Sequence, residues 1–70
     1  MFREPVVSSS IAAIGYDADN ETLEVEFRSG AIYRYRHVEE DVHDRLLEAP
    51  SKDAFFNEHI RSAYPCEQVE

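Results

Sequence analysis

Apolar and polar side chains alternate along the first half of the chain, as they do in strands with one buried face. The alternation is clearest over 22–28 and over 31–37, with the inward positions Leu23, Val25, Phe27, Tyr33 and Tyr35. A further stretch, 11–17, can place three more apolar side chains on the same face, namely Ala12, Ile14 and Tyr16. The pattern therefore predicts three consecutive strands.

The loop that contains Gly30 decides how the last two of these strands pair. A two-residue turn would place Val25 opposite Arg34 and mix apolar with charged side chains on one face. A three-residue loop with Gly30 in the left-handed conformation places Val25 opposite Tyr33 and makes one face apolar throughout. We therefore expect the bulged register. The other expected pairs are Phe27 with Ala31, Leu23 with Tyr35, Glu24 with Arg34, Glu26 with Ile32, Thr22 with Arg36 and, in the preceding strand pair, Tyr16 with Leu23.

The second half of the chain changes to a helical period. One apolar stripe ends at Pro50, which stops a helix, and Ser51 is a suitable N-cap for the next helix. The two stripes comprise Val42, Leu46 and Ala49, then Phe56, Ile60, Ala63 and Tyr64. The second helix is expected to run to Pro65.

These elements predict an α+β fold of the order β-β-β-α-α. A three-stranded antiparallel meander would be covered on one face by two C-terminal helices, because a sheet with one apolar face needs a covering layer. We expect a single domain over 1–70 with its core at about 9–65. Residues 1–8 are expected to form a loose arm and residues 65–70 a frayed acidic tail.

Length and charge restrict the function. Seventy residues cannot form a deep catalytic cleft between subdomains, and 15 acidic against seven basic residues give a net charge of −8. The electrostatic field of this negative net charge opposes non-specific binding to nucleic acids and to anionic membrane surfaces. The single Cys66 cannot form an internal disulfide, and no apolar run approaches the length of a membrane span. We expect a cytoplasmic protein.

One local basic patch stands out in this acidic chain. Arg28, Arg34 and Arg36 fall within nine residues on the expected open face of the sheet, and Arg3 could reach them. The favoured interpretation is a solvated ion-pair lattice with neighbouring glutamates. The alternative is a site for an anion, RNA or an acidic partner. Tyr33 and Tyr35 invite a base-stacking interpretation, but the expected register places both rings in the core under the helices.

The residues with catalytic or metal-binding chemistry form no recognisable motif. His37, His43 and His59 do not share metal-ligand spacing, and the serines at 8–10 are not set in a nucleophile elbow. Two glycines cannot make a phosphate-cradling loop. We therefore expect no enzyme, no cofactor and no metal.

Several short patterns occur together in a fixed order: Ile14-Gly15-Tyr16-Asp17, Leu23-x-Val25-x-Phe27, Gly30-x-x-Tyr33-x-Tyr35, Ala49-x-Ser51 and Phe56-x-x-x-Ile60-x-x-x-Tyr64. In this order the chain resembles the KTSC family, a short domain found at the C-terminus of some lysyl-tRNA synthetases and as small stand-alone bacterial proteins. The Tyr-x-Tyr pair is the central mark of that family.

The resemblance implies no catalytic activity, and RNA binding has been suggested for the family. Glu39 and Asp53 depart from the family pattern, which tends to have Pro and Gly there. If the second position needs a left-handed backbone, Asp53 would cost about 1 kcal/mol unless the helix begins earlier. From the sequence we expect a small non-catalytic binding module with an unknown protein partner. An RNA-binding accessory domain that uses the basic open face is the alternative.

Overall fold

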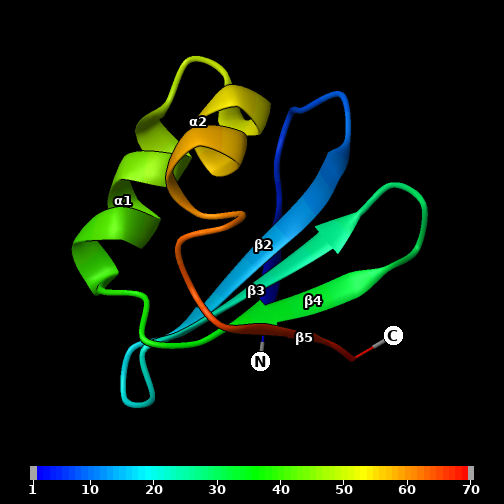
Figure 1. Cartoon of the computed structure of the whole chain (residues 1–70). Helices are drawn as coiled ribbons and strands as arrows, with labels where there is room; N and C mark the ends of the chain where they lie inside the picture. Colours follow the sequence, from blue (N-terminus) through cyan, green and yellow to red (C-terminus); the bar gives the residue numbers. More distant parts are fainter. Residues whose placement is uncertain (1, 70) are drawn as a thin grey trace.

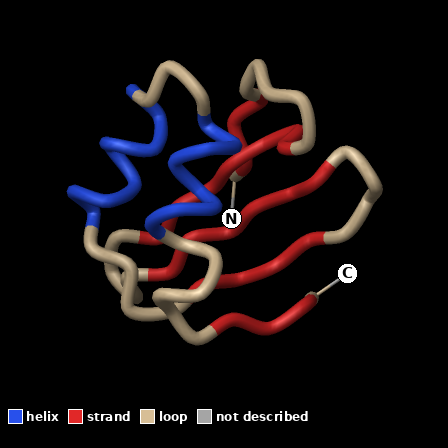
Figure 2. Tube along the Cα trace, turned by 45° about the horizontal axis from the view of Figure 1, so that its top comes forward, coloured by secondary structure: helices blue, strands red, loops and turns tan. Residues whose placement is uncertain are grey.

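The structure is a computed structural model that describes residues 2–69. A five-stranded sheet in the order β1-β2-β3-β4-β5, antiparallel throughout, carries two helices on one face (Figures 1 and 2). The elements are β1 (Arg3–Pro5), β2 (Ile11–Asp17), β3 (Thr22–Phe27), β4 (Ile32–Tyr35), α1 (Glu40–Glu48), α2 (Lys52–His59) and β5 (Cys66–Gln68). The α+β class is as predicted from the sequence, but the sheet has five strands rather than three.

The register of the three central strands confirms the bulged loop. Val25 is the partner of Tyr33, Leu23 lies between Tyr16 and Tyr35, and Glu24 faces Arg34. The core is formed by buried side chains from both layers, namely Ile11, Ile14, Leu23, Val25, Tyr35, Val38, Leu46, Phe56 and Ile60. The helices thus cover most of one face of the sheet, and the other face carries no helix.

Gly30 has φ +99° in the loop between β3 and β4, as the bulged register requires. A Cβ atom at this position would meet no atom within 4 Å, so the cost of a side chain comes mainly from the backbone conformation. Gly30→Val is expected to lower the free energy of unfolding by about 1–2 kcal/mol, because a β-branched residue disfavours positive φ. Ser29→Ala is the control and should change it by at most about 0.5 kcal/mol. Equal urea-unfolding curves for the two variants would contradict the expectation.

The expected loose arm and frayed tail were wrong, because both chain ends add a strand to the sheet. Arg3–Pro5 pairs with β2, and Cys66–Gln68 pairs with β4. The neighbouring main chain extends both pairings, through Val6 N to Ala12 O at 3.2 Å and Val69 N to Ile32 O at 2.7 Å. Neither segment has an alternating pattern long enough to predict a strand; each is held by the unpaired edge of the meander.

Ala12 does not join the apolar face as expected, because β2 contains an irregularity between Ile11 and Ala13. Ile11 is the partner of Phe27 and is fully buried in the core. A bulge lets two residues of one strand oppose one of the other, which shifts the alternation by one position. The larger side chain therefore takes the place expected for Ala12.

The second helix is shorter than predicted. The N-cap is Ser51, whose hydroxyl accepts the Ala54 N–H, as expected. The helix ends at His59, because Ile60 leaves helical geometry and the Arg61 N–H bonds back to the Phe56 carbonyl. The chain can then turn toward β5 instead of continuing to Pro65.

The two departures from the family pattern are accommodated without strain. Glu39 is the N-cap of α1 with φ −68°, a value that proline also adopts. Asp53 lies within α2, so no left-handed backbone is needed there. Among the described residues other than glycine, positive φ occurs at Glu21 and His37.

Candidate functional site

One row of residues crosses the open face of the sheet from edge to edge. Arg3, Gly15, Glu24, Arg34 and Glu67 are successive Cα partners on β1 to β5. Because directly opposed residues project to the same face, the row alternates cations and carboxylates, interrupted by a glycine between Arg3 and Glu24. The sequence predicted the Glu24–Arg34 pair but not the two outer members, since β1 and β5 were not expected.

Glu24 is the centre of this row and is only 2% exposed. The Arg34 Nε lies 2.7 Å from one of its carboxylate oxygens, and an Arg3 terminal nitrogen binds the other. Burial raises the pKa of Glu24, but hydrogen bonds and charges from Arg34 and Arg3 outweigh it and hold the pKa below its ordinary value. Ionised Glu24 thus links β1, β3 and β4 through ion pairs, and Arg3, Glu24 and Arg34 together are called the brace.

Gly15 makes room for this brace. It lies between Arg3 and Glu24 in the row and is itself buried. A side chain at this position would stand on the open face between the guanidinium and the carboxylate. The absence of a Cβ therefore lets Arg3 reach across β2 to Glu24.

The other arginines of the expected basic patch do not gather around Glu24. Arg36 forms an ion pair with Glu67 of β5. Arg28 lies at the opposite end of the β3–β4 hairpin, where its Nε donates to the Ser8 carbonyl at 2.9 Å. The structure thus brings Arg3 and Arg34 together, places Arg36 two residues after Arg34 and just beyond the end of β4, and separates Arg28 from the rest.

The tyrosines of the Tyr-x-Tyr pair project to the helix-covered face. Tyr35 is 4% exposed and packs edge-on against Phe56 with ring centroids 5.4 Å apart. Burial raises the pKa of Tyr35 to about 12. Tyr33 is half-buried, and its hydroxyl lies 3.4 Å from the side-chain oxygen of Gln68. Tyr35 is therefore a core residue, whereas Tyr33 also reaches the surface.

Tyr33 borders an aromatic groove, defined here as the depression of about 500 Å³ between β4 and α2. Its aromatic lining packs edge-to-face, with Phe27 centroids 5.8 Å from Tyr33 and 5.6 Å from Phe56. The tip of the β3–β4 hairpin extends beyond the two helices (Figure 1), and the groove lies between this hairpin and α2. The polar lining consists of Ser10, Asp53, Asn57, Arg61 and Cys66.

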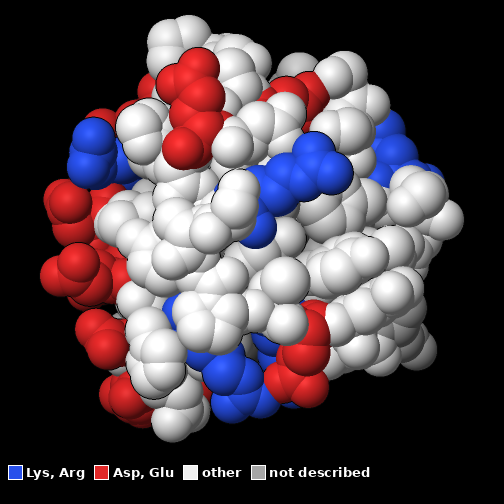
Figure 3. Space-filling view, viewed as in Figure 1, with Lys and Arg blue, Asp and Glu red and all other residues white. Residues whose placement is uncertain are grey.

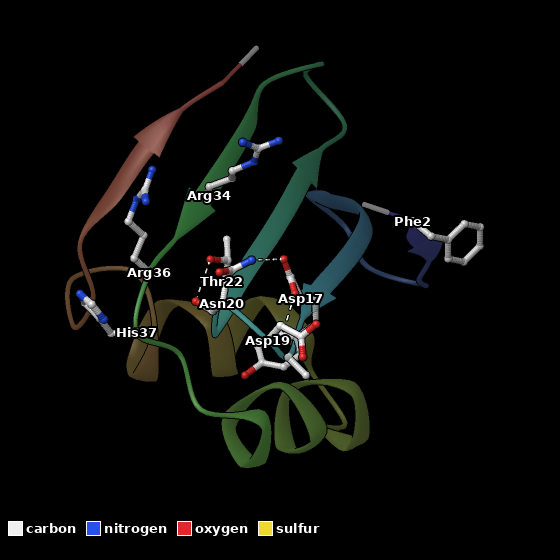
Figure 4. Close-up of a pocket in the computed structure, with 10 residues that line it drawn as sticks. Phe2, Asp17, Asp19, Asn20, Thr22, Arg34, Arg36 and His37 are labelled. Atoms are coloured by element: carbon white, nitrogen blue, oxygen red, sulfur yellow. Dashed lines mark hydrogen bonds between the residues drawn. The ribbon is translucent and has the colours of Figure 1, made fainter.

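A second depression lies at the far end of the sheet (Figure 4). This charged hollow, of about 790 Å³, is open and shallow. Arg34, Arg36 and His37 line it from β4 and the following loop, and Asp17 and Asp19 line it from β2 and the turn after it. The remaining lining residues are Phe2, Tyr16, Ala18, Asn20 and Thr22.

Acidic side chains are concentrated on α1 rather than spread evenly. The exposed acids of this helix are Glu40, Asp41, Asp44 and Glu48. In Figure 3, red atoms line the side of the molecule on which α1 lies, whereas the centre of that face is mostly uncharged. A polyanion would therefore meet repulsion along one whole flank.

The serines at 8–10 serve a structural purpose. All three hydroxyls donate to the carboxylate of Asp53, with Ser10 at 2.9 Å. Hydrogen bonds from Ser8 and then Ser9 lower the pKa of Asp53 to about 2. The segment before β2 is thus fastened to the first turn of α2, close to the aromatic groove.

The histidines do not meet. His43 stacks on Tyr16 with centroids 4.7 Å apart, and burial lowers the pKa of His43. His59 packs against Phe55, while His37 lies at the charged hollow. Within residues 2–69 no group of three His, Cys, Asp or Glu side chains is arranged to hold a metal ion. None of the helices in that range is long and apolar enough to cross a membrane.

Comparison with known proteins places the chain in a family. The KTSC domain matches residues 7–64. A crystal structure of a KTSC domain protein from Yersinia pestis superimposes with a TM-score of 0.96 at 40% identity, over 99% of this chain and 97% of that one. The chain therefore belongs to the KTSC domain family.

Relatives occur both as small proteins and as parts of larger ones. An uncharacterized protein of Stutzerimonas stutzeri is 48% identical over 58 residues, which are 83% of this chain and 82% of the relative. A lysine–tRNA ligase of Nostoc punctiforme is 38% identical over 61 residues, but these are 87% of this chain and 11% of the ligase. The chain thus spans a small fraction of the ligases that it matches.

Proposed function

We propose that this KTSC domain is a non-catalytic binding module whose partner is a protein. The observation that carries the proposal is the aromatic groove, where Phe27 and Tyr33 stay only half-buried beside α2. A partly open set of aromatic rings is the kind of pocket that anchors an apolar side chain of a partner. The partner would therefore present a large apolar residue to the space between β4 and α2.

The electrostatics support a protein rather than RNA. Arg3 and Arg34 form ion pairs with Glu24, and Arg36 forms one with Glu67, so these carboxylates offset much of the positive charge that a phosphate would meet. The net charge of −8 adds long-range repulsion of a polyanion. The ion pairs of these arginines therefore join neighbouring strands of the sheet in the absence of any partner.

RNA binding is the second candidate, and the relatives that are lysine–tRNA ligases favour it. In this candidate function the exposed arginines Arg28, Arg34 and Arg36, with the half-buried Arg3, would contact phosphates. Counterion release then requires the affinity to fall steeply as salt is raised.

The groove is tested by selecting peptides from a random display library on the immobilised protein and measuring the affinity of the enriched peptide. We expect enrichment of a large apolar residue and at least a tenfold weaker affinity for Tyr33→Ala. Tyr64→Ala removes a half-buried tyrosine that packs against the core outside the groove lining and is the matched control. Thermal melts establish that both variants are folded.

Absence of enrichment, or equal affinity for the wild type and Tyr33→Ala, would refute the groove as a protein-binding site. RNA is tested in parallel by titrating transfer RNA at about 50 and about 200 mM salt, with no binding expected at either. Binding that weakens steeply with salt and disappears in the doubly substituted Arg34→Gln/Arg36→Gln protein would overturn the preference for a protein partner.

A further inference from the structure

The charged hollow lies on the opposite face of the sheet from the aromatic groove and has walls of opposite sign. Figure 4 shows Arg34, Arg36 and His37 along one side and Asp17 and Asp19 near the other. Neither a uniformly basic nor a uniformly acidic ligand matches such a surface. A ligand that carries both charges does.

The sheet fixes the distance between the two walls. Asp17 is the Cα partner of Thr22, and the last Cα pair of β3 with β4 is Leu23–Tyr35, so Thr22 directly precedes that pair on β3 and Arg36 directly follows it after β4. Two strand spacings separate the backbones of Asp17 and Arg36, about 10 Å. Thr22 lies between them as the floor of the hollow. The charges of a ligand must therefore be several bonds apart to reach both walls.

Both walls retain binding capacity after their internal contacts are made. Arg34 uses its Nε on Glu24, and Arg36 uses one terminal nitrogen on Glu67. A guanidinium has five N–H donors, so donors remain on each. On the other wall, the Asp17 carboxylate accepts from the Asn20 side chain at 2.8 Å and from the Asp19 N–H at 3.1 Å. These bonds orient the carboxylate and lower the pKa of Asp17, with the Asn20 side chain as the main cause.

The two loops that form the hollow are held at an energetic cost. Glu21 and His37 have φ of +49° and +64°, and the Val38 N–H donates to the Glu21 carbonyl at 2.9 Å between them. Left-handed geometry is disfavoured for a residue other than glycine. His37 thereby lies beside Arg36 at the rim (Figure 4).

We propose that the charged hollow binds a small zwitterion that carries an ammonium and a carboxylate, of the class of a short peptide. The carboxylate would contact Arg36 and Arg34, and the ammonium would contact Asp17 and Asp19. A phosphate polyanion is disfavoured, because the acidic wall would repel it. This inference is independent of the aromatic groove.

The test titrates triglycine into the isotopically labelled protein and follows the backbone amides by NMR. We expect saturable shifts in residues 17–22 and 34–37. N-acetyl-triglycine lacks the ammonium, and triglycinamide lacks the carboxylate, so each is expected to bind at least tenfold more weakly. Glycine should also bind more weakly, because its charges lie too close together for both walls.

Four variants separate the contacts from the fold. Arg36→Gln and Asp19→Asn should each weaken triglycine binding at least tenfold, whereas Arg45→Gln on α1, outside the hollow, should leave it unchanged. His37→Gly removes the left-handed strain at this position. The variant should therefore melt at or above the melting temperature of the wild type.

Several outcomes would overturn the inference. The first is the absence of any saturable shift with triglycine. The second is an affinity for the two singly charged analogues equal to that for triglycine. The third is tighter binding of inorganic phosphate than of triglycine. Glycine binding as tightly as triglycine would also overturn the inference, because the charges of glycine lie too close together to reach both walls.

Discussion

Replacing Phe56 with alanine is expected to lower the free energy of unfolding by about 3–5 kcal/mol, a large part of the stability of so small a domain. Phe56 is 4% exposed and packs against both Phe27 and Tyr35, so truncation would leave a cavity between α2 and the sheet. Urea unfolding monitored by circular dichroism measures the loss.

The same deletion at other phenylalanines provides the control. Phe27 packs against the core but is only half-buried, so Phe27→Ala should cost less, about 2–3 kcal/mol. Phe2 is 80% exposed, and Phe2→Ala should change stability by at most about 0.5 kcal/mol. A Phe56→Ala protein that unfolds like Phe2→Ala would show that α2 does not cover the sheet as described.

Replacing Glu24 with alanine is the second large effect, with an expected loss of about 2–4 kcal/mol at neutral pH. The change removes the one carboxylate shared by Arg3 and Arg34, so Arg34 loses this ion pair and Arg3 keeps only its ion pair with Glu26. The cost stays below that of a fully buried unpaired charge, because both arginine side chains still reach water. Glu26→Ala is the matched control on the same strand; Glu26 is more exposed and should cost at most about 1 kcal/mol.

The Glu24 contribution also depends on pH in a defined direction. Its pKa in the folded protein lies below the ordinary value of 4.5. The stabilisation is therefore fully present above that value and is lost as the pH falls through the lowered pKa. The difference in unfolding free energy between wild type and Glu24→Ala should shrink between neutral pH and about pH 3. A difference that stays constant would mean that the carboxylate is not ionised in the brace.

The central part of the fold was predictable because local and long-range signals agree there. The alternation around Val25, the Gly30 loop and the Ser51 cap each have one favourable solution, and together they determine the register and the helical cover. The bulge in β2 was not predictable, since alternation alone cannot show where a strand gains a residue.

The candidate sites were predictable only in part, because they depend on the two edge strands. The pairing of Glu24 with Arg34 follows from the meander, but the contribution of Arg3 requires β1. Glu67, which binds Arg36, requires β5. A three-residue strand has too little pattern to be recognised, and its pairing depends on an edge that exists only after the rest has folded.

The brace on the open face has a consequence for how the sequence can change over time. Arg3, Glu24 and Arg34 act as a unit, and Gly15 leaves the space that the unit occupies. The effects of substitutions in such a unit are not additive, because the loss of Glu24 removes an ion pair of both arginines at once. Epistasis should therefore tie these four positions together, so that a change tolerated at one depends on the residues at the others.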